Sequence, residues 1–372
     1  MNIALGALLL TAASCSNVDN DGVNFETDLP NAVYRDGLSS TALTKVTLTD
    51  EGASATITPR AANLVKGNTK VVVGVDTAAL TKYNQKYGTN YKPLPASYYT
   101  LSKTEVDIPA GQITNGSIAL NINPLNGPDI NSSTKYAIPV KIQHADGLDV
   151  LSTSDTQIFA LDRILHTTVM RIENFYLRIP FSPDYMSDTW TLSYGMRIDR
   201  NKDNQATVSF GGPNGSMYSR ITAGGGLQFK TGGTDDPLAF AKTKIVPNTW
   251  YYVTWVYDHQ HVKCYINGVL DNEFESSVVN GFTQINVSWG ALVGYIRELR
   301  LYNTTLSDFQ IMDNLYIEDP TNKNLVLYFP LDQANGLNNI ATGSPYKAEA
   351  MTGNDPYDAS AIKYVPWSFP EQ

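Results

Sequence analysis

Residues 249–276 read TWYYVTWVYDHQHVKCYINGVLDNEFES, and this stretch decides the fold. From Tyr251 onward the side chains alternate between two faces, and neither face is polar. Such a strand is covered on both sides, or it is covered on one side and lines a groove with the other. Asn267-Gly268 then supplies the two positive-φ residues of a type I′ hairpin turn. We therefore predict three antiparallel strands here, at the start of the sheets that the later chain completes.

The composition indicates β structure and more than one domain. The chain has 372 residues, and 22 of them are tyrosine while only 17% are charged. This length suits two domains that each bury a core, and the excess of aromatic residues favours strands. The formal net charge is −9 without any basic cluster. Nothing would neutralise phosphates, so a nucleic-acid partner is excluded.

The N-terminus predicts export. Residues 3–10 form an apolar run of signal-peptide length, too short to span a membrane. The run leads into LTAASC, which ends at Cys15 and resembles a bacterial lipobox; an ordinary secretory signal with an incidental cysteine is the alternative. We assign residues 1–15 to the signal and lipobox and residues 16–30 to a polar tether. Its acidic residues resemble the surface-export signal of Bacteroidetes lipoproteins, which implies an outer-membrane, cell-surface location through a lipid on Cys15.

Residues 31–163 form the next predicted domain. Short strands follow one another between Gly, Pro, Asn and Asp clusters, as in an immunoglobulin-like sandwich, and one helix begins after Asp76 and ends at Gly88. The phrases ALTKYN, GTNYKPLP and VDIPAGQ resemble an N-terminal domain of Bacteroidetes surface lipoproteins. In that family the domain stands between the lipid anchor and a carbohydrate-active or carbohydrate-binding module. The resemblance implies a spacer and carries no catalytic residue.

Residues 164–372 form the last predicted domain. The phrases NTWYYV, YING and GYIRELRLYN, the last running into Leu306-Ser307, resemble the laminin-G and concanavalin-A-like jelly roll in its bacterial surface form. Ser307 and Gln310 have capping-box spacing at the start of a predicted helix. The resemblance implies an all-β fold that hosts lectins, hydrolases and adhesion modules alike.

Catalysis by the known glycosidase route is not favoured. Glycosidases need two carboxylates that face each other across the sugar. Glucanases of this superfamily carry them on one strand as Glu-x-Asp-x-x-Glu, and no such run occurs. Glu273 and Glu275 have only the i, i+2 spacing, and Glu298 stands beside two arginines that would keep it ionised. The pattern favours a protein that is not an enzyme, while a hydrolase with a rearranged carboxylate pair remains open.

No cofactor is required by the sequence. Cys264 lies on an apolar strand face and is read as a buried thiol, and the pair His259 and His261 lacks a third metal ligand. Modules of the resembled family often bind a structural calcium ion in a rim loop. The carboxylates in suitable loops fix no ligand set; they are Asp184, Asp188, Asp199, Asp203 and Asp332.

The remaining chemistry is recognition of sugars by aromatic and polar side chains. Sugars present apolar C–H faces and polar edges, which suit flat rings next to hydrogen-bonding groups. Six residues would line a groove if the predicted strands that carry them belong to one concave sheet. They are Tyr218, Arg220, Tyr252, Trp289, Glu298 and Arg300. Trp250 and Trp255 are expected in the core, whereas Trp289 fits the core and the groove equally well.

Together these features predict a cell-surface lipoprotein that binds a polysaccharide or oligosaccharide without cleaving it. By resemblance it would act beside the outer-membrane proteins of a polysaccharide-uptake system. The rivals are a concanavalin-A-like glycoside hydrolase and a protein-binding adhesion or structural module. An accessible aromatic-lined hollow separates the lectin from the adhesion module, and the glycine-, asparagine- and proline-rich segment 334–358 is long enough to cover such a hollow.

Overall fold

The fold was analysed in a computed structural model, which describes residues 31–37, 42–131, 134–212, 216–231, 239–289 and 292–370. The predicted signal, lipobox and tether, with Cys15, lie outside these residues. Within the described ranges, no helix is both long and apolar enough to cross a membrane.

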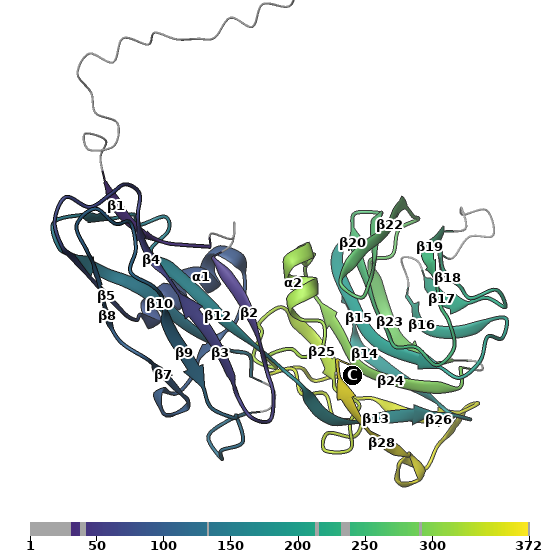
Figure 1. The fold of residues 1–372 in the computed structure, drawn as a ribbon. Helices are drawn as coiled ribbons and strands as arrows, with labels where there is room; N and C mark the ends of the chain where they lie inside the picture. The colour runs from purple at the N-terminus through teal and green to yellow at the C-terminus, as the bar shows by residue number, and fades with distance from the viewer. Residues whose placement is uncertain are drawn as a thin grey trace, which may run out of the picture.

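The first half of the chain is a sandwich of short strands, called here the N-terminal sandwich (Figure 1). Its largest sheet has the order β2-β12-β10-β5-β8, with β6 paired to β10; two three-stranded sheets have the orders β11-β1-β4 and β3-β9-β7. The strands are β1 (Ala32–Arg35), β2 (Leu43–Leu48), β3 (Ala53–Ile57), β4 (Pro59–Ala61), β5 (Thr69–Val75), β6 (Lys92–Pro93), β7 (Tyr99–Leu101), β8 (Glu105–Ile108), β9 (Ile118–Ile122), β10 (Tyr136–Ala145), β11 (Asp149–Val150) and β12 (Thr156–Arg163).

Within the described residues two α-helices interrupt the strands, and both carry the caps that the sequence predicts. Helix α1 (Thr77–Tyr87) begins after Asp76, whose side chain accepts a hydrogen bond from the Ala78 N–H, and ends at Gly88, whose φ of 64° suits glycine. Helix α2 (Asp308–Asp313) follows Ser307, which forms a reciprocal capping box with Gln310. The two 3₁₀ turns are η1 (Ala96–Tyr98) and η2 (Ala359–Ala361).

The second half of the chain is a sandwich of two large sheets. They are called here the near sheet and the far sheet, according to their distance from the N-terminal sandwich. The near sheet has the order β22-β21-β20-β15-β24-β13-β28, with β25 paired to β24. Its strands are β13 (Leu165–Ile172), β15 (Thr189–Ile198), β20 (Tyr251–Asp258), β21 (His261–Ile266), β22 (Val269–Glu275), β24 (Gly294–Tyr302), β25 (Leu325–Phe329) and β28 (Tyr364–Phe369).

The far sheet has the order β19-β18-β17-β16-β23-β14-β26-β27. Its strands are β14 (Tyr176–Met186), β16 (Gln205–Gly211), β17 (Met217–Ile221), β18 (Gly226–Thr231), β19 (Ala239–Lys244), β23 (Gly281–Val287), β26 (Glu349–Thr352) and β27 (Asp355–Pro356). The main core fills the space between the two sheets, where Trp190, Trp255 and Phe282 are fully buried.

The stretch that opened the sequence analysis forms β20, β21 and β22, as predicted. Asn267 and Gly268 have φ values of 52° and 82°, as a type I′ turn requires. Strand β20 lies between β21 and β15, and both of its faces are buried. Trp255 points into the main core. Trp250 packs on the opposite side of the near sheet, against Phe369.

The near sheet faces the N-terminal sandwich, and the far sheet lies on the opposite side of the molecule (Figure 1). Strand β12 pairs in the N-terminal sandwich and β13 in the near sheet, so the chain passes between the two at Ile164. Segment 334–358 runs around the edge of the second sandwich. Asn339 bonds the backbone of β25 on the near side, and β26 joins the far sheet beside β14.

Candidate functional site

The outward face of the far sheet carries a continuous row of polar side chains. Alternation turns Phe210, Ile285 and Leu177 into the core, and their strand neighbours therefore point outward. The strand register places six of these neighbours side by side from β18 to β26: Lys230, Tyr218, Ser209, Asn286, Arg178 and Glu349. With about 4.8 Å between strands, this far-sheet row is roughly 24 Å long.

The two ends of the far-sheet row differ from its middle. Ser209 and Asn286 are short, and only 8% and 9% of their surface is exposed. Tyr218 and Arg178, which flank them, are longer and half-buried. At one end Arg178 donates from Nε and Nη2 to Glu349 Oε2, at 2.9 and 2.6 Å. The row thus offers amide, hydroxyl, guanidinium and carboxylate groups in a fixed order.

Tyr218 and Arg220 are linked because both side chains donate a hydrogen bond to Asn204. The Tyr218 hydroxyl donates to Asn204 Oδ1 at 3.1 Å, and Arg220 Nη1 donates to the same oxygen at 2.9 Å. Arg220 Nε also donates to Gln228 Oε1 at 2.6 Å. Burial raises the pKa of Tyr218, and the charge of Arg220 partly opposes the rise. The phenol therefore stays protonated at neutral pH, and its ring orientation is set before any ligand binds.

Trp289 lies just beyond the end of β23. Ser288, in the left-handed region with φ of 65°, donates its N–H to the Thr207 carbonyl at 2.8 Å, and Trp289 then has 52% of its surface exposed. Of the two placements that the sequence left open for Trp289, the core is therefore wrong. Its part in a binding face stays a prediction.

The six residues that the sequence analysis placed along one groove do not all lie on one sheet, so that expectation is wrong. Tyr218 and Arg220 belong to the far sheet, whereas Tyr252, Glu298 and Arg300 belong to the near sheet. The alternation was read correctly, because Leu299 and Leu301 do point into the core and Glu298 and Arg300 do point away from it. The sequence does not show which strands are neighbours, and that is where the prediction fails.

Tyr252, Glu298 and Arg300 are buried under other parts of the chain. Their exposed fractions are 4%, 4% and 1%. Glu298 forms ion pairs with Arg300 and, at 3.3 Å, with Arg297, and it accepts a hydrogen bond from the Tyr328 hydroxyl at 3.0 Å. Burial alone would lower the pKa of Arg300, but Glu298 raises it above its ordinary value. This cluster is occupied by its own partners and is closed to a glycan.

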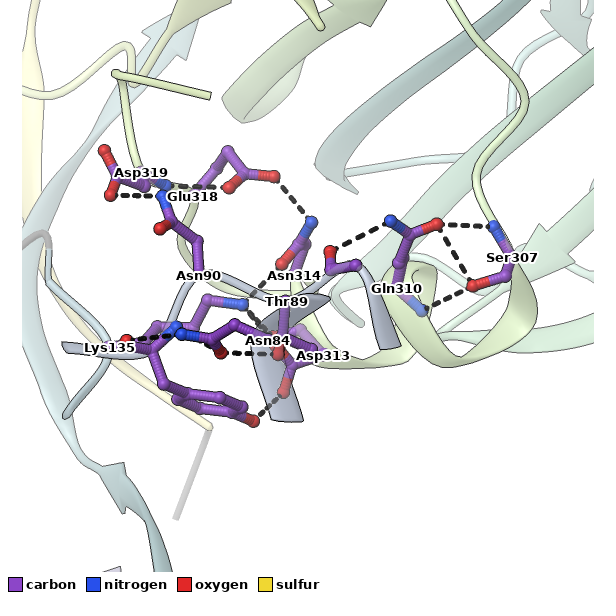
Figure 2. A network of polar contacts seen from close by, with 12 residues as sticks. Asn84, Thr89, Asn90, Lys135, Ser307, Gln310, Asp313, Asn314, Glu318 and Asp319 are labelled. Atoms are coloured by element: carbon purple, nitrogen blue, oxygen red, sulfur yellow. Dashed lines mark hydrogen bonds and ion pairs between the residues drawn. The ribbon is translucent and has the colours of Figure 1, made fainter. Parts of the chain in front are cut away.

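The polar cluster continues into the contact between the two sandwiches (Figure 2). Glu318 accepts from the Tyr302 hydroxyl at 2.9 Å and from Asn314 Nδ2 at 2.5 Å. Asn314 and its neighbour Asp313 both accept from Lys135 of the N-terminal sandwich. The outward polar residues of the near sheet therefore bind the segment around Asn314 and Glu318, and this segment in turn contacts the N-terminal sandwich.

Further bonds across the same contact surround this cluster. Tyr91 donates to Asp313, Asn90 Nδ2 donates to Asp319 at 2.5 Å, and Gln310 Nε2 donates to the Gly88 carbonyl at 3.0 Å (Figure 2). Burial would raise the pKa of Asp313, but Lys135 outweighs it and holds the pKa below its usual range. Asp313 is therefore ionised in the folded protein at neutral pH.

The carboxylates considered for catalysis do not form a pair across the far-sheet row. Glu273 and Glu275 lie on the edge strand β22 and both contact His261, at 3.4 and 2.9 Å. Glu298 is buried on the near side. The row itself contains one carboxylate, Glu349, which Arg178 occupies. The geometry of a retaining or inverting glycosidase is therefore not present in this row.

Three of the five aspartates considered for calcium have partners at separate places. Asp199 pairs with Arg171 at 2.6 Å, Asp188 accepts from Asn280 at 2.7 Å, and Asp332 accepts from the Asn335 N–H at 2.7 Å. In the part of the chain that the structure describes, no three His, Cys, Asp or Glu side chains come together as metal ligands. Cys264 is buried, and burial raises the pKa of its thiol.

Comparison with known proteins agrees with this architecture. Residues 173–312 match the concanavalin A-like lectin/glucanases superfamily. Residues 28–149 match a family defined as an N-terminal domain. The predicted arrangement, an immunoglobulin-like N-terminal sandwich followed by a concanavalin A-like jelly roll, is confirmed. No curated protein matches the sequence.

Solved structures match most or part of the chain. A protein from Bacteroides ovatus ATCC 8483, provisionally described as a carbohydrate binding protein, is 20% identical with a TM-score of 0.51, and the match covers 88% of this chain and 99% of that one. Domain 4 of AbnA, an arabinanase from Geobacillus stearothermophilus in complex with arabinotriose, is 21% identical over 35% of this chain and 68% of that chain, with a TM-score of 0.31. EndoBT-3987 from Bacteroides thetaiotamicron, solved with a Man5GlcNAc product, is 18% identical over 35% of this chain and 30% of that chain, with a TM-score of 0.26.

The strand register brings together residues of the far-sheet row that the sequence analysis did not name. Ser209, Asn286, Arg178 and Lys230 lie next to core residues of their strands, and alternation would have turned them outward. Glu349 instead lies in segment 334–358, which the sequence analysis treated as a covering loop, although part of it forms β26. The missing information was the pairing of β16 with β23 and of β14 with β26. These strands are far apart in the sequence, and only the fold brings them together.

Proposed function

We propose that the protein binds a glycan on the outward face of the far sheet and does not cleave it. The far-sheet row carries the proposal, because it presents hydrogen-bonding groups and an aromatic ring across six neighbouring strands on the side away from the N-terminal sandwich. An extended row of this length, roughly 24 Å, suits several successive sugars of a linear chain better than a single monosaccharide.

The chemistry of the row fits sugars. Tyr218 offers a ring face to apolar C–H groups, and Asn286, Ser209 and Arg178 offer donors and acceptors to hydroxyl groups. The concanavalin A-like fold and the B. ovatus neighbour, described in terms of carbohydrate binding, support this assignment. The single carboxylate in the row, Glu349, supports binding without hydrolysis.

The proposed setting is the cell surface of a bacterium. Cys15 would carry a lipid anchor in the outer membrane, residues 31–163 would act as the spacer, and residues 164–372 would capture polysaccharide for neighbouring uptake proteins. Metabolic labelling with a palmitate analogue tests the anchor. We expect label on the full-length protein expressed in a Bacteroides host, and none on the Cys15→Ser variant.

Isothermal titration against a panel of plant, fungal and host polysaccharides tests the function itself. We expect saturable binding to at least one linear polysaccharide, and no release of reducing ends from it over a day of incubation. Absence of binding to the whole panel by a folded sample would contradict the proposal. Release of reducing ends would replace it with the hydrolase alternative.

A further inference from the structure

A second hollow lies in the N-terminal sandwich, on the side of helix α1 that faces strands β10 and β12. Its volume is about 640 Å³, within the range of sites that hold small organic ligands. The described residues that carry the argument are Arg35, Lys82, Tyr83, Lys86, Lys141 and Asp155. None of them belongs to the far-sheet row.

Helix α1 forms one wall of this hollow because of its sequence spacing. Ala79, Lys82, Tyr83, Lys86 and Tyr87 follow one another at steps of three, one, three and one residues, which places them on one side of a helix. The opposite wall consists of residues 152–156 and Ile158 of the β12 region. Four of these residues are Ser or Thr, so the wall offers hydroxyl groups next to one apolar side chain.

Positive charge exceeds negative charge in the hollow. Arg35 is 1% exposed, and its Nε donates to the Thr156 carbonyl at 2.5 Å. Lys141 lies 3.5 Å from Asp76 and 3.7 Å from Asp155, so this lysine pairs with both carboxylates of the hollow. Lys82 and Lys86 are exposed at the rim and lie one helical turn apart. Four cations therefore face two carboxylates in a chain whose net charge is −9.

The hollow also has an aromatic side. The rings of Tyr83 and Tyr87 lie 4.6 Å apart with an angle of 38°, and the Lys86 ammonium lies 4.9 Å from the centre of the Tyr87 ring. A flat ring beside excess positive charge and hydroxyl groups is the combination that a sugar with an acidic group needs. A simple inorganic anion would not use the aromatic wall.

We propose that this hollow is a second ligand site, which binds a short acidic saccharide bearing a carboxylate or a sulfate. The acidic group lies between Lys82, Lys86 and Lys141, and the sugar ring lies against the half-buried Tyr87. The site is separate from the far-sheet face and does not depend on the function proposed for that face.

Titration with trigalacturonate and with a monosulfated chondroitin disaccharide tests this site in the full chain. We expect at least one of them to bind, with an affinity at least tenfold weaker in the double variant Lys82→Ala/Lys86→Ala. Lys66→Ala, which removes an exposed lysine of the same sandwich outside the hollow, is the matched control and should leave the affinity unchanged. Tyr218→Ala on the far sheet should also leave it unchanged.

Four results would overturn the proposal. They are no binding of either probe, an equal loss of affinity in the Lys66 control, equal binding of neutral maltotriose, and equal binding of inorganic sulfate alone. Loss of binding in Tyr218→Ala would assign the acidic saccharide to the far sheet and would also overturn a second site. Thermal unfolding of every variant confirms that each is folded, since Lys82 and Lys86 are exposed and their truncation should not disturb the core.

Discussion

The two outward faces of the second sandwich carry the same types of residue. On one face these residues are buried by other parts of the chain, and on the other face they are in contact with solvent. Both the near sheet and the far sheet present Arg, Glu and Tyr side chains away from the shared core. On the near sheet, Arg300 and Glu298 are buried with partners that lead to the N-terminal sandwich. On the far sheet, Arg178 and Glu349 pair in contact with solvent. The same residue types thus hold two halves together on one face and stay available to a ligand on the other.

This difference shows that residue type does not identify a binding face. A polar side chain that points away from the core can join two parts of the chain or stay available to a ligand. Whether another part of the chain covers it decides between these two roles. Buried ion pairs need every partner, because removing one leaves an uncompensated charge in a medium that solvates it poorly. Exposed pairs contribute little to stability and are easily rearranged by a ligand. The four predictions below test that contrast, and the first of them makes matched changes on the two faces.

The largest expected effect comes from Glu298→Gln. The change leaves Arg297 and Arg300 without their shared carboxylate in the buried cluster, and we expect the free energy of unfolding to fall by about 3 kcal/mol or more. Urea denaturation measures it. Glu349→Gln makes the same chemical change on the far sheet and should leave stability nearly unaltered. Equal losses in the two variants would contradict the contrast between the faces.

Lys135→Met should also destabilise the protein, by about 3 kcal/mol, because Asp313 would remain buried without its cation. The exposed fractions of Lys135 and Asp313 are 11% and 4%. Lys70→Met is the control, since Lys70 pairs with Glu105 at 3.0 Å on the surface and its loss should have little effect. Differential scanning calorimetry gives the unfolding temperatures. If Lys70→Met lowered the unfolding temperature as much as Lys135→Met, the contact between the sandwiches would not have the proposed importance.

Tyr218→Ala should weaken glycan binding about tenfold, as expected when a ring contact worth roughly 1.4 kcal/mol is removed. The matched control is Tyr98→Ala in the N-terminal sandwich, where a half-buried tyrosine donates to Asp129 much as Tyr218 donates to Asn204. Titration calorimetry with the bound polysaccharide compares the two. An unchanged affinity in Tyr218→Ala would remove Tyr218 from the site.

A smaller effect is expected on acidification. The pKa of Asp313 is lower in the folded protein than in the unfolded chain, so its ionised form stabilises the fold above about pH 4, and this contribution is lost as the pH falls through the lowered pKa. Asp313→Asn should therefore be less stable than the wild type at neutral pH, and the difference should shrink below pH 4. Urea denaturation between pH 2 and pH 7 measures it. A difference that stays constant over this range would show that the charge of Asp313 is not the cause.

The elements of this fold were largely predictable, whereas their neighbours in space were not. The Asn267-Gly268 turn, the Asp76 and Gly88 helix ends and the Ser307 capping box depend on local geometry that a sequence states directly. The grouping of Tyr252 with Tyr218 failed because strand order depends on long-range pairing. Glu298 is buried beside Tyr328, which lies 30 residues further along the chain, and its partner Arg300 donates to the Asn314 carbonyl. Alternation gives the face of a side chain but does not reveal what covers that face.

The crystal structure of the protein with an oligosaccharide of its strongest-binding polysaccharide is the most direct test of the account. We predict a linear chain of sugars on the far sheet, crossing the strands from β18 towards β26 with contacts to Tyr218, Asn286 and Arg178. The near-sheet cluster should be unchanged. A glycan that lies anywhere else while the far-sheet row remains bare would contradict the central claim.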